Sequence, residues 1–217
     1  MGRISGDEVC LDIDESVLKG KDEVLLCACG TSYHAALSAS YLLERLAKIR
    51  TKVEIASEFR YKSPFLNKNA LFVAISQSGE TADTLEALKI AKNAGLKSLA
   101  ICNVDNSSIV RLADAVLLTR AGIEKGVAST KAFATQVLVL WLLALRLAKM
   151  RNTLSPSEFN RETEALRGIP AVLNFSPALQ ERIYRICKHY LHGHGFFFIG
   201  RDIFYPLALE GALKHIY

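Results

Sequence analysis

Short apolar runs alternate with helical repeats along residues 1–150 of the chain. The apolar runs are typical of buried strands, and three longer stretches repeat apolar residues every three to four positions, as helices do. The predicted strands are Val24–Cys29, Val53–Ala56, Ala70–Ser76, Ser98–Cys102 and Ala115–Thr119. The predicted helices are Ser32–Lys48, Ala82–Asn93 and Ser129–Met150.

This order of elements predicts an α/β fold. Strands that alternate with helices form a mostly parallel sheet with helices on both faces, which is a three-layer αβα sandwich. Ligands bind to such sheets beyond the carboxyl ends of the strands. We therefore expect a site at two polar loops, 30–32 and 77–81, which follow the first and third predicted strands.

The pattern changes after Met150. Four of the five prolines lie beyond this residue, and 151–160 is polar. We interpret 151–177 as a connector with a short helix at Ser157–Leu166. A second unit then begins with a helix at Ala178–His192 and a strand at Gly195–Ile199.

The second unit resembles the first. LLCACGTSYHAAL and FFFIGRDIFYPLAL share an apolar strand, a glycine, polar residues, a tyrosine and an apolar helix. We interpret 1–22 as a leader, 23–150 as the first domain and 178–217 as the start of a second copy. This copy is truncated after one strand and part of a helix, so the chain is interpreted as a fragment.

Composition narrows the class of protein. Half of the residues are hydrophobic and 23% are charged, which excludes disorder and a coiled coil. The net charge is +5, but the lysines and arginines are scattered, so we expect no nucleic-acid partner. The uncharged run Ala132–Leu145 is too short for a membrane span and is interpreted as a buried helix of a soluble protein.

The five cysteines are odd in number and have no disulfide spacing. We therefore expect a reducing compartment and a cytoplasmic protein. His189, His192 and His194 are close in sequence but lack a clear fourth ligand, so we predict no metal site.

The strongest candidate site is SQSGET (76–81). A helix N-terminus presents unpaired N–H groups and a partial positive charge, so it attracts anions. The hydroxyls of Ser76, Ser78 and Thr81 and the amide of Gln77 add neutral hydrogen-bond donors, which together predict a phosphate cradle. Simple N-capping by Ser78 or Thr81 is the alternative.

Two further stretches begin helices. Cys29, Gly30, Thr31 and Ser32 make the same strand-to-helix transition as the cradle. The stretch GVASTK (126–131) precedes the long helix, where Ser129 or Thr130 as N-cap is the alternative to a binding role. Neither a P-loop nor a G-x-G-x-x-G motif occurs, which disfavours a dinucleotide.

Five motifs carry a resemblance to a known family. They are ACGTSY (28–33), EIASEFRY (54–61), SQSGETADT (76–84), GVASTKAF (126–133) and ALEGALK (208–214), in this order. Together they resemble the isomerase half of the glucosamine-6-phosphate synthase family, the isomerising glutamine–fructose-6-phosphate aminotransferases. The resemblance implies sugar-isomerase (SIS) domains and covers almost the whole chain.

The resemblance implies a site for fructose-6-phosphate or glucosamine-6-phosphate. The positions of Ser32, Ser76, Gln77, Ser78 and Thr81 hold the phosphate in the family. Cys29, Gly30 and Thr31 lie against the sugar, Val127 contacts it through its backbone, and Lys214 assists ring opening and proton transfer. The family uses no metal and no pyridoxal cofactor, and its shared site implies a homodimer.

The chain departs from the family at both ends. An amidotransferase domain would precede Met1, and a catalytic glutamate is expected where Tyr217 stands. A phenol ionises far above neutral pH and is a poor substitute for that carboxylate. We therefore expect this chain alone to be inactive and to bind sugar phosphate weakly or not at all.

Two alternative functions remain open. A single-domain aldose–ketose sugar-phosphate isomerase would leave residues 151–217 unexplained. A non-catalytic sugar-phosphate sensor of the kind found in transcription regulators would need a helix-turn-helix, which 1–22 does not provide. Glu80 and Glu124 would repel a phosphate, so we expect them to point away or to orient neighbours, whereas Lys131 could supply positive charge.

Overall fold

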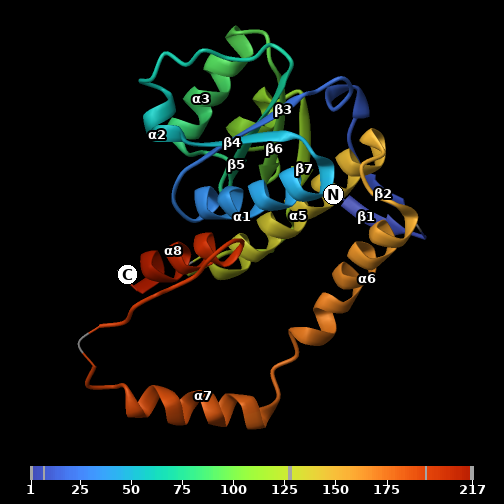
Figure 1. Ribbon diagram of the computed structural model, residues 1–217. Coiled ribbons are helices and arrows are strands. Elements are labelled where there is room, and N and C mark those ends of the chain that lie inside the picture. The colour runs from blue at the N-terminus through green and yellow to red at the C-terminus, as the bar shows by residue number, and fades with distance from the viewer. Residues whose placement is uncertain (1, 7, 127–128, 194, 216–217) are drawn as a thin grey trace.

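Five parallel strands form the central sheet (Figure 1). The computed structural model describes residues 2–6, 8–126, 129–193 and 195–215. The strand order is β4-β3-β5-β6-β7, so β3 and β5 are neighbours. The bounds are β3 Glu23–Ala28, β4 Arg50–Ile55, β5 Ala70–Ser76, β6 Lys97–Cys102 and β7 Ala115–Leu118.

Helices cover both faces of the sheet, as the sequence predicted. One face carries α1 (Gly30–Ala47) and α5 (Thr130–Arg151). The other carries α2 (Ala56–Phe59), α3 (Ala82–Asn93) and α4 (Ser108–Leu112). Alternate residues of each strand point to opposite faces, so both faces of β3 are apolar and buried. The three-layer αβα sandwich is confirmed.

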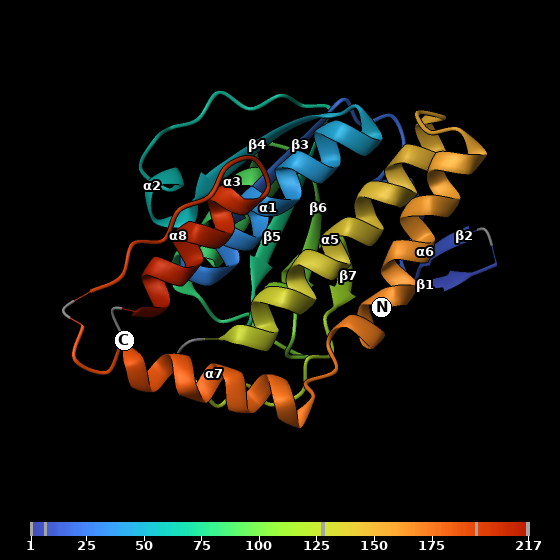
Figure 2. The same ribbon diagram turned by 60° about the horizontal axis from the view of Figure 1, so that its bottom comes forward.

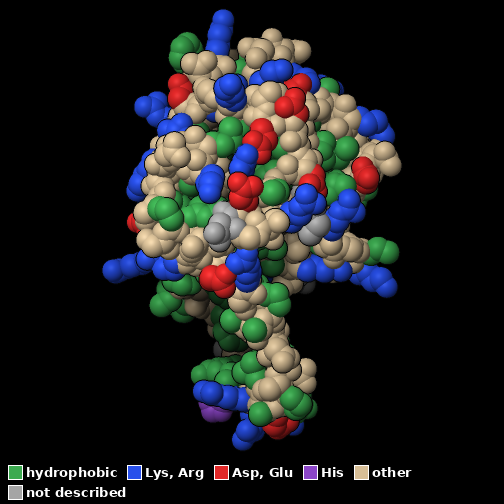
Figure 3. Space-filling view, turned by 90° about the vertical axis from the view of Figure 1, so that its right-hand side faces the viewer, with side chains coloured by type: hydrophobic (Ala, Val, Ile, Leu, Met, Phe, Trp, Pro, Cys, Tyr) green, Lys and Arg blue, Asp and Glu red, His purple; other side chains and the backbone are tan. Residues whose placement is uncertain are grey.

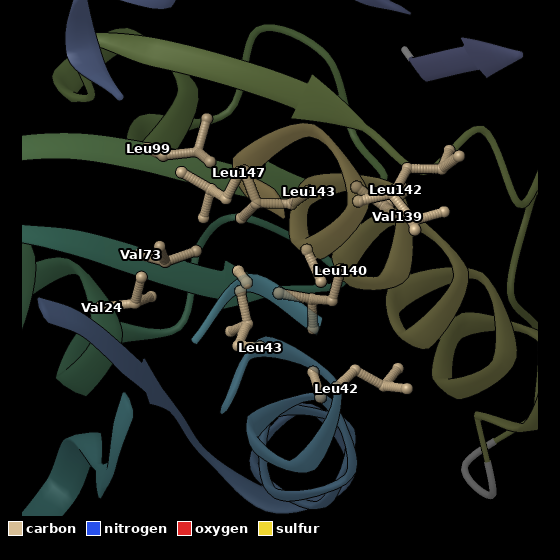
Figure 4. Close-up of a cluster of buried hydrophobic side chains, with 14 of the residues drawn as sticks. Val24, Leu42, Leu43, Val73, Leu99, Val139, Leu140, Leu142, Leu143 and Leu147 are labelled. Atoms are coloured by element: carbon tan, nitrogen blue, oxygen red, sulfur yellow. The ribbon is translucent and has the colours of Figure 1, made fainter. Parts of the chain in front are cut away.

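The larger part of the core lies between the sheet, α1 and α5. Figure 4 shows leucines of α5 pointing between α1 and the strands. Leu43 of α1, Leu140 and Leu143 of α5, and Val73 of β5 are all fully buried. This packing holds α1 and α5 together against one face of the sheet. Both helices follow parallel strands, α1 after β3 and α5 after β7, and they begin at the same end of the molecule (Figure 2).

The described part of the predicted leader, residues 2–6 and 8–22, packs onto the first domain. The strands β1 (Gly2–Ser5) and β2 (Glu8–Leu11) form an antiparallel pair, and the 3-10 helix η1 (Glu15–Val17) follows. Val9 and Leu11 are buried in the same core cluster as α5. These contacts were not predicted, because the segment is short and its apolar residues are separated by charged ones.

Three more helices follow the sandwich. They are α6 (Pro156–Val172), α7 (Pro177–His189) and α8 (Phe204–His215). α6 is longer than the predicted helix and begins with a capping box formed by Ser155 and Glu158. α8 packs against α1 (Figure 1). Every residue of α7, by contrast, is exposed.

The predicted strand at Gly195–Ile199 is wrong. These residues form no strand, and Phe197 and Ile199 are 99% and 92% exposed. A strand needs a neighbour for its backbone N–H and C=O groups, and the described residues 195–215 supply none. Whether 178–217 begins a second domain stays a prediction.

α5 has the length and composition of a membrane-spanning helix, and it is the one such helix among the described residues. Half of its apolar stretch is buried, because it packs against the sheet and α1. The prediction of a buried helix over Ala132–Leu145 agrees with this packing.

Candidate functional site

The loop after β5 is stabilised by hydrogen bonds of its own hydroxyl groups. Ser76 Oγ accepts a hydrogen bond from the Gly79 amide at 3.0 Å, and it lies 3.0 Å from Thr81 Oγ1. Thr81 occupies the N-cap position of α3, but its side chain makes no capping bond. One hydroxyl hydrogen joins Ser76 to Thr81, so the pair keeps a second hydrogen for a ligand. Simple capping by Thr81 is therefore not its role.

Gly79 lies tightly against the loop that follows β6. Its φ is +70°, and an added Cβ would lie 2.0 Å from Ser107 Oγ and 2.7 Å from Cys102 Sγ. Only glycine fits this close approach without displacing its neighbours. Gly79 thus fixes the loop of Ser76–Thr81 against the rest of the sheet edge.

Glu80 is turned away from the loop, as expected from its charge. Its Oε1 accepts a hydrogen bond from the Ser108 amide at 2.8 Å, at the start of α4. Hydrogen bonds from Ser108 lower the pKa of the Glu80 carboxyl below its ordinary value. Glu80 therefore caps a neighbouring helix instead of meeting a bound anion.

The second loop begins α1 at the end of β3. Cys29 is the N-cap residue and makes no side-chain capping bond, and Gly30 has a φ of +54° and open space around it. Thr31 is half-buried, whereas Ser32 is buried and accepts a hydrogen bond from Gln136 Nε2 at 3.0 Å. Since β3 and β5 are adjacent and parallel, both loops lie at one edge of the sheet, as predicted.

The start of α5 adds a third helix N-terminus at this end. Ser129 occupies the N-cap position without a side-chain capping bond, and Glu124 Oε2 accepts from the Ala132 amide at 3.2 Å instead. Lys131 is exposed and donates to the Ile123 carbonyl at 2.5 Å. Val127, the remaining predicted position of this stretch, lies outside the described residues.

A pocket of about 460 Å³ opens beside the Ser76–Thr81 loop, at the carboxyl ends of β5, β6 and β7. Gln77 lines it together with Asn103, Arg120 and Glu124. Asn103 holds the wall of the pocket in place, because it bonds the Ala121 amide at 2.7 Å and the Gly122 carbonyl at 2.8 Å. Among the substrate-binding residues predicted from the sequence and described in the structure, Gln77 lines this pocket.

Lys214 lies in a charged cluster between α8, α1 and α5. Its Nζ is 3.0 Å from Glu210 Oε1, an ion pair without the geometry of a directed hydrogen bond, and 5.3 Å from the centre of the Phe133 ring. Glu210 is 1% exposed, and its Oε2 is 2.8 Å from His34 Nδ1. Contact with Phe133, in the first turn of α5, brings Lys214 to the end of the molecule where the loops lie.

The thiol of Cys27 lies in β3, two residues before the second loop. Burial, with smaller contributions from Cys29 and Glu54, raises the pKa of the Cys27 thiol to about 12, so this thiol stays protonated at neutral pH. All five cysteines are free thiols. Among the described residues no three side chains assemble a metal site, and His194 lies outside them.

The family is decided by a comparison of sequences. The profile of the SIS domain family matches residues 17–146, which is more than half of the chain. The chain belongs to the SIS domain family. It is 64% identical over 215 residues to the isomerising glutamine–fructose-6-phosphate aminotransferase of Campylobacter jejuni, and 53% identical over 213 residues to that of Helicobacter pylori. The resemblance predicted from five motifs is confirmed.

The similarity is confined to one part of these relatives. The alignments cover 99% and 98% of this chain but only 35% and 36% of the relatives' length. A solved structure of the C-terminal domain of glucosamine-fructose-6-phosphate aminotransferase from Francisella tularensis superposes with a TM-score of 0.91 and 42% identity, over 97% of this chain and 60% of that one. A glucosamine-6-phosphate deaminase from Thermotoga maritima superposes with a TM-score of 0.70 and 28% identity, over 93% of this chain and 59% of that one.

Three residues of this site were not predicted. Glu210 precedes Lys214 by four positions, a helical spacing that would have indicated an ion pair. Gln136 is a polar residue within an apolar helix, which is an unusual position for an amide. His34 follows a motif residue, Tyr33, but nothing in its local pattern indicates its contact with Glu210, which is 176 residues away.

Proposed function

We propose that this chain is the sugar-phosphate-binding part of an isomerising glutamine–fructose-6-phosphate aminotransferase. The parent enzyme would convert fructose-6-phosphate and glutamine to glucosamine-6-phosphate and glutamate. The observation that carries the proposal is 64% identity over 99% of the chain to the enzyme of that name. The alternatives, a single-domain aldose–ketose isomerase and a sugar-phosphate sensor, have no comparable similarity to support them.

The phosphate of the sugar would be held by the loops after β3 and β5. The hydroxyl of Ser78 accepts from the Glu80 amide at 3.2 Å, so its hydrogen is left to donate, as is one hydrogen of the Ser76–Thr81 pair. The N-termini of α1 and α3 supply the partial positive charge that favours a dianion. The Gln77 amide would add a further donor to the phosphate, whereas Cys29, Gly30, Thr31 and the backbone of Val127 would lie against the sugar.

Lys214 would act at the reacting end of the sugar. Its partner Glu210 is buried and fixes the ammonium group between α8 and the first turn of α5. A cation held in this way stabilises negative charge that develops on a sugar oxygen as the ring opens or a proton moves between C1 and C2. The carboxylate that completes proton transfer in the family has no counterpart at Tyr217, so this chain alone would be inactive.

Further expectations concern the parent enzyme. An amidotransferase domain would supply ammonia from glutamine, and two copies of the chain would form a homodimer. The free cysteines are compatible with a cytoplasmic enzyme. We expect neither a nucleic-acid nor a membrane partner.

The proposal is tested by titrating the ¹⁵N-labelled chain with glucosamine-6-phosphate and recording amide spectra. The amides of Gly79 and Gly30 are expected to shift at millimolar ligand, and glucosamine without phosphate is expected to leave them in place. Thr81→Val removes one donor to a charged group, so the dissociation constant is expected to rise about tenfold.

Thr163→Val is the matched control. Thr163 is a buried threonine of α6, away from both loops, and its hydroxyl donates to the Asn160 carbonyl of its own helix. Its substitution is expected to leave binding unchanged. Equal shifts with glucosamine, or full affinity in Thr81→Val, would contradict the phosphate cradle. Formation of glucosamine-6-phosphate from fructose-6-phosphate and ammonia by this chain would contradict its expected inactivity.

A further inference from the structure

Gln136 of α5 is a buried amide with an incomplete set of hydrogen bonds. Its side chain is 1% exposed. Nε2 donates to Ser32 Oγ at 3.0 Å, whereas Oε1 accepts no hydrogen bond from the described residues. Burying an amide in this state costs free energy, so the position is not explained by stability alone.

The bond from Gln136 determines how the Ser32 hydroxyl is oriented. A hydroxyl has one hydrogen and two lone pairs. Because the amide donates to the Ser32 oxygen, the Ser32 hydrogen is not directed at Gln136. The amide therefore occupies the acceptor side of the hydroxyl and leaves its donor side free.

Two other serines of α1 use their hydroxyl hydrogens differently from Ser32. Ser38 donates to the His34 carbonyl at 3.1 Å, and Ser40 donates to the Leu37 carbonyl at 2.7 Å, so both use their hydrogens within the helix. The Ser32 hydroxyl donates to no acceptor among the described residues. Ser32 also differs in place, since it lies in the first turn of α1, beside the N-terminus that faces the carboxyl edge of the sheet.

We propose that Gln136 is a positioning residue that holds the Ser32 hydroxyl with its hydrogen toward the bound phosphate. This inference rests on the proposed function of the site. Gln136 does not itself touch the ligand in this arrangement. It acts through Ser32, because an amide donor on one side of a hydroxyl makes that hydroxyl a better donor on the other side.

The test is a double-substitution cycle on the full chain with glucosamine-6-phosphate as the probe. Ser32→Ala and Gln136→Met are each expected to raise the dissociation constant about tenfold, as the loss of one bond to a charged group does. The double variant is expected to bind no more weakly than either single variant, because both remove the same bond. Ser38→Ala, a buried serine of the same helix, is the matched control and is expected to bind normally.

A spectroscopic measurement separates positioning from a structural role and needs no substitution at Gln136. The side-chain amide signals of Gln136 are expected to shift when ligand binds the wild-type chain, and to stay in place in Ser32→Ala.

Gln136→Glu offers a second variant of nearly the same shape. Burial raises the pKa of the introduced carboxyl, so the comparison is made at a pH where it is ionised. The carboxylate then only accepts hydrogen bonds, so it would turn the Ser32 hydrogen inward, and binding is expected to weaken at least as much as in Gln136→Met.

The outcomes distinguish two failures. Normal binding in Gln136→Met with weak binding in Ser32→Ala would overturn the inference, and so would additive effects in the double variant. Gln136 signals that respond equally to ligand in Ser32→Ala would also overturn it. A wild-type chain without any phosphate-dependent shift would instead contradict the proposed function, and the inference with it.

Discussion

The sandwich of residues 23–151 and helix α7 differ in the burial of their apolar residues. Leucines of α1 and α5 are fully buried between helices and sheet (Figure 4). Every residue of 170–193 is exposed. Figure 3 shows hydrophobic side chains open on the projecting part of the molecule. Both regions follow a helical pattern, so the pattern fixes the helix but not its burial.

The largest expected effect tests this contrast directly. Leu143→Ala removes a fully buried side chain of α5 and is expected to lower the free energy of unfolding by about 3 kcal/mol, through lost burial and a cavity. Leu191→Ala, just beyond α7, removes a side chain that is 73% exposed and is expected to change it by less than about 0.5 kcal/mol. Urea unfolding followed by circular dichroism measures both. Equal losses would show that the two regions are packed alike in solution.

Removal of a helix cap is expected to have a smaller effect on the free energy of unfolding, and it again compares a packed helix with an exposed one. Ser155 caps α6 and Ser176 caps α7, because the side-chain oxygen of each accepts a hydrogen bond from a backbone amide of its helix. Ser155→Ala is expected to lower the free energy of unfolding by about 1 kcal/mol, because α6 is anchored by the buried Phe159. Ser176→Ala is expected to reduce only the local helicity of α7. Amide hydrogen exchange would separate a local from a global loss, and a global loss in Ser176→Ala would contradict the contrast.

An effect of similar size is expected at Asp114, and it depends on pH. Asp114 bonds the Ser98 amide and Lys92 Nζ, both at 2.8 Å. Burial acts to raise the pKa of the Asp114 carboxyl, but hydrogen bonds from Lys92 and Ser98 outweigh it and hold the pKa below its ordinary value of 3.8. The stabilisation is therefore present above pH 3.8 and is lost as the pH falls through the folded-state pKa.

Asp114→Asn is accordingly expected to lower the free energy of unfolding at pH 7 by on the order of 1 kcal/mol. The difference from the wild-type chain should shrink as the pH falls below 3.8. Glu181→Gln is the control in α7, where Glu181 forms an exposed ion pair with Arg185 at 3.8 Å. No measurable change is expected there, and thermal unfolding at a series of pH values checks both variants.

Much of the fold could be predicted because its strands are short, buried and apolar on both faces. β5 was predicted at its observed bounds, Ala70–Ser76. The start of β4 was missed by three residues, because it is an edge strand whose exposed positions carry polar side chains. The strand at Gly195–Ile199 was wrong because an apolar run forms a strand only beside a partner.

The candidate site was predicted in part. The loop residues Ser76 and Thr81 could be identified because four polar groups at a helix start exceed what capping needs. Their bond to each other, and the bond from Gln136 to Ser32, depend on contacts across the fold and could not be read from local sequence. The cluster of Lys214 with His34 likewise joins residues far apart in the chain.

The sequence by itself determined the kinds of element, their order and the polar loops that end two strands, because hydrophobic period and capping chemistry are local. Only the tertiary structure decided that β3 and β5 are neighbours, which places the two loops beside each other at that edge. It also decided that Gln136 meets Ser32 and that α7 keeps its apolar side chains exposed. The physical reason is that burial and hydrogen-bond partners are set by what packs against a residue, and that neighbour is seldom close in sequence.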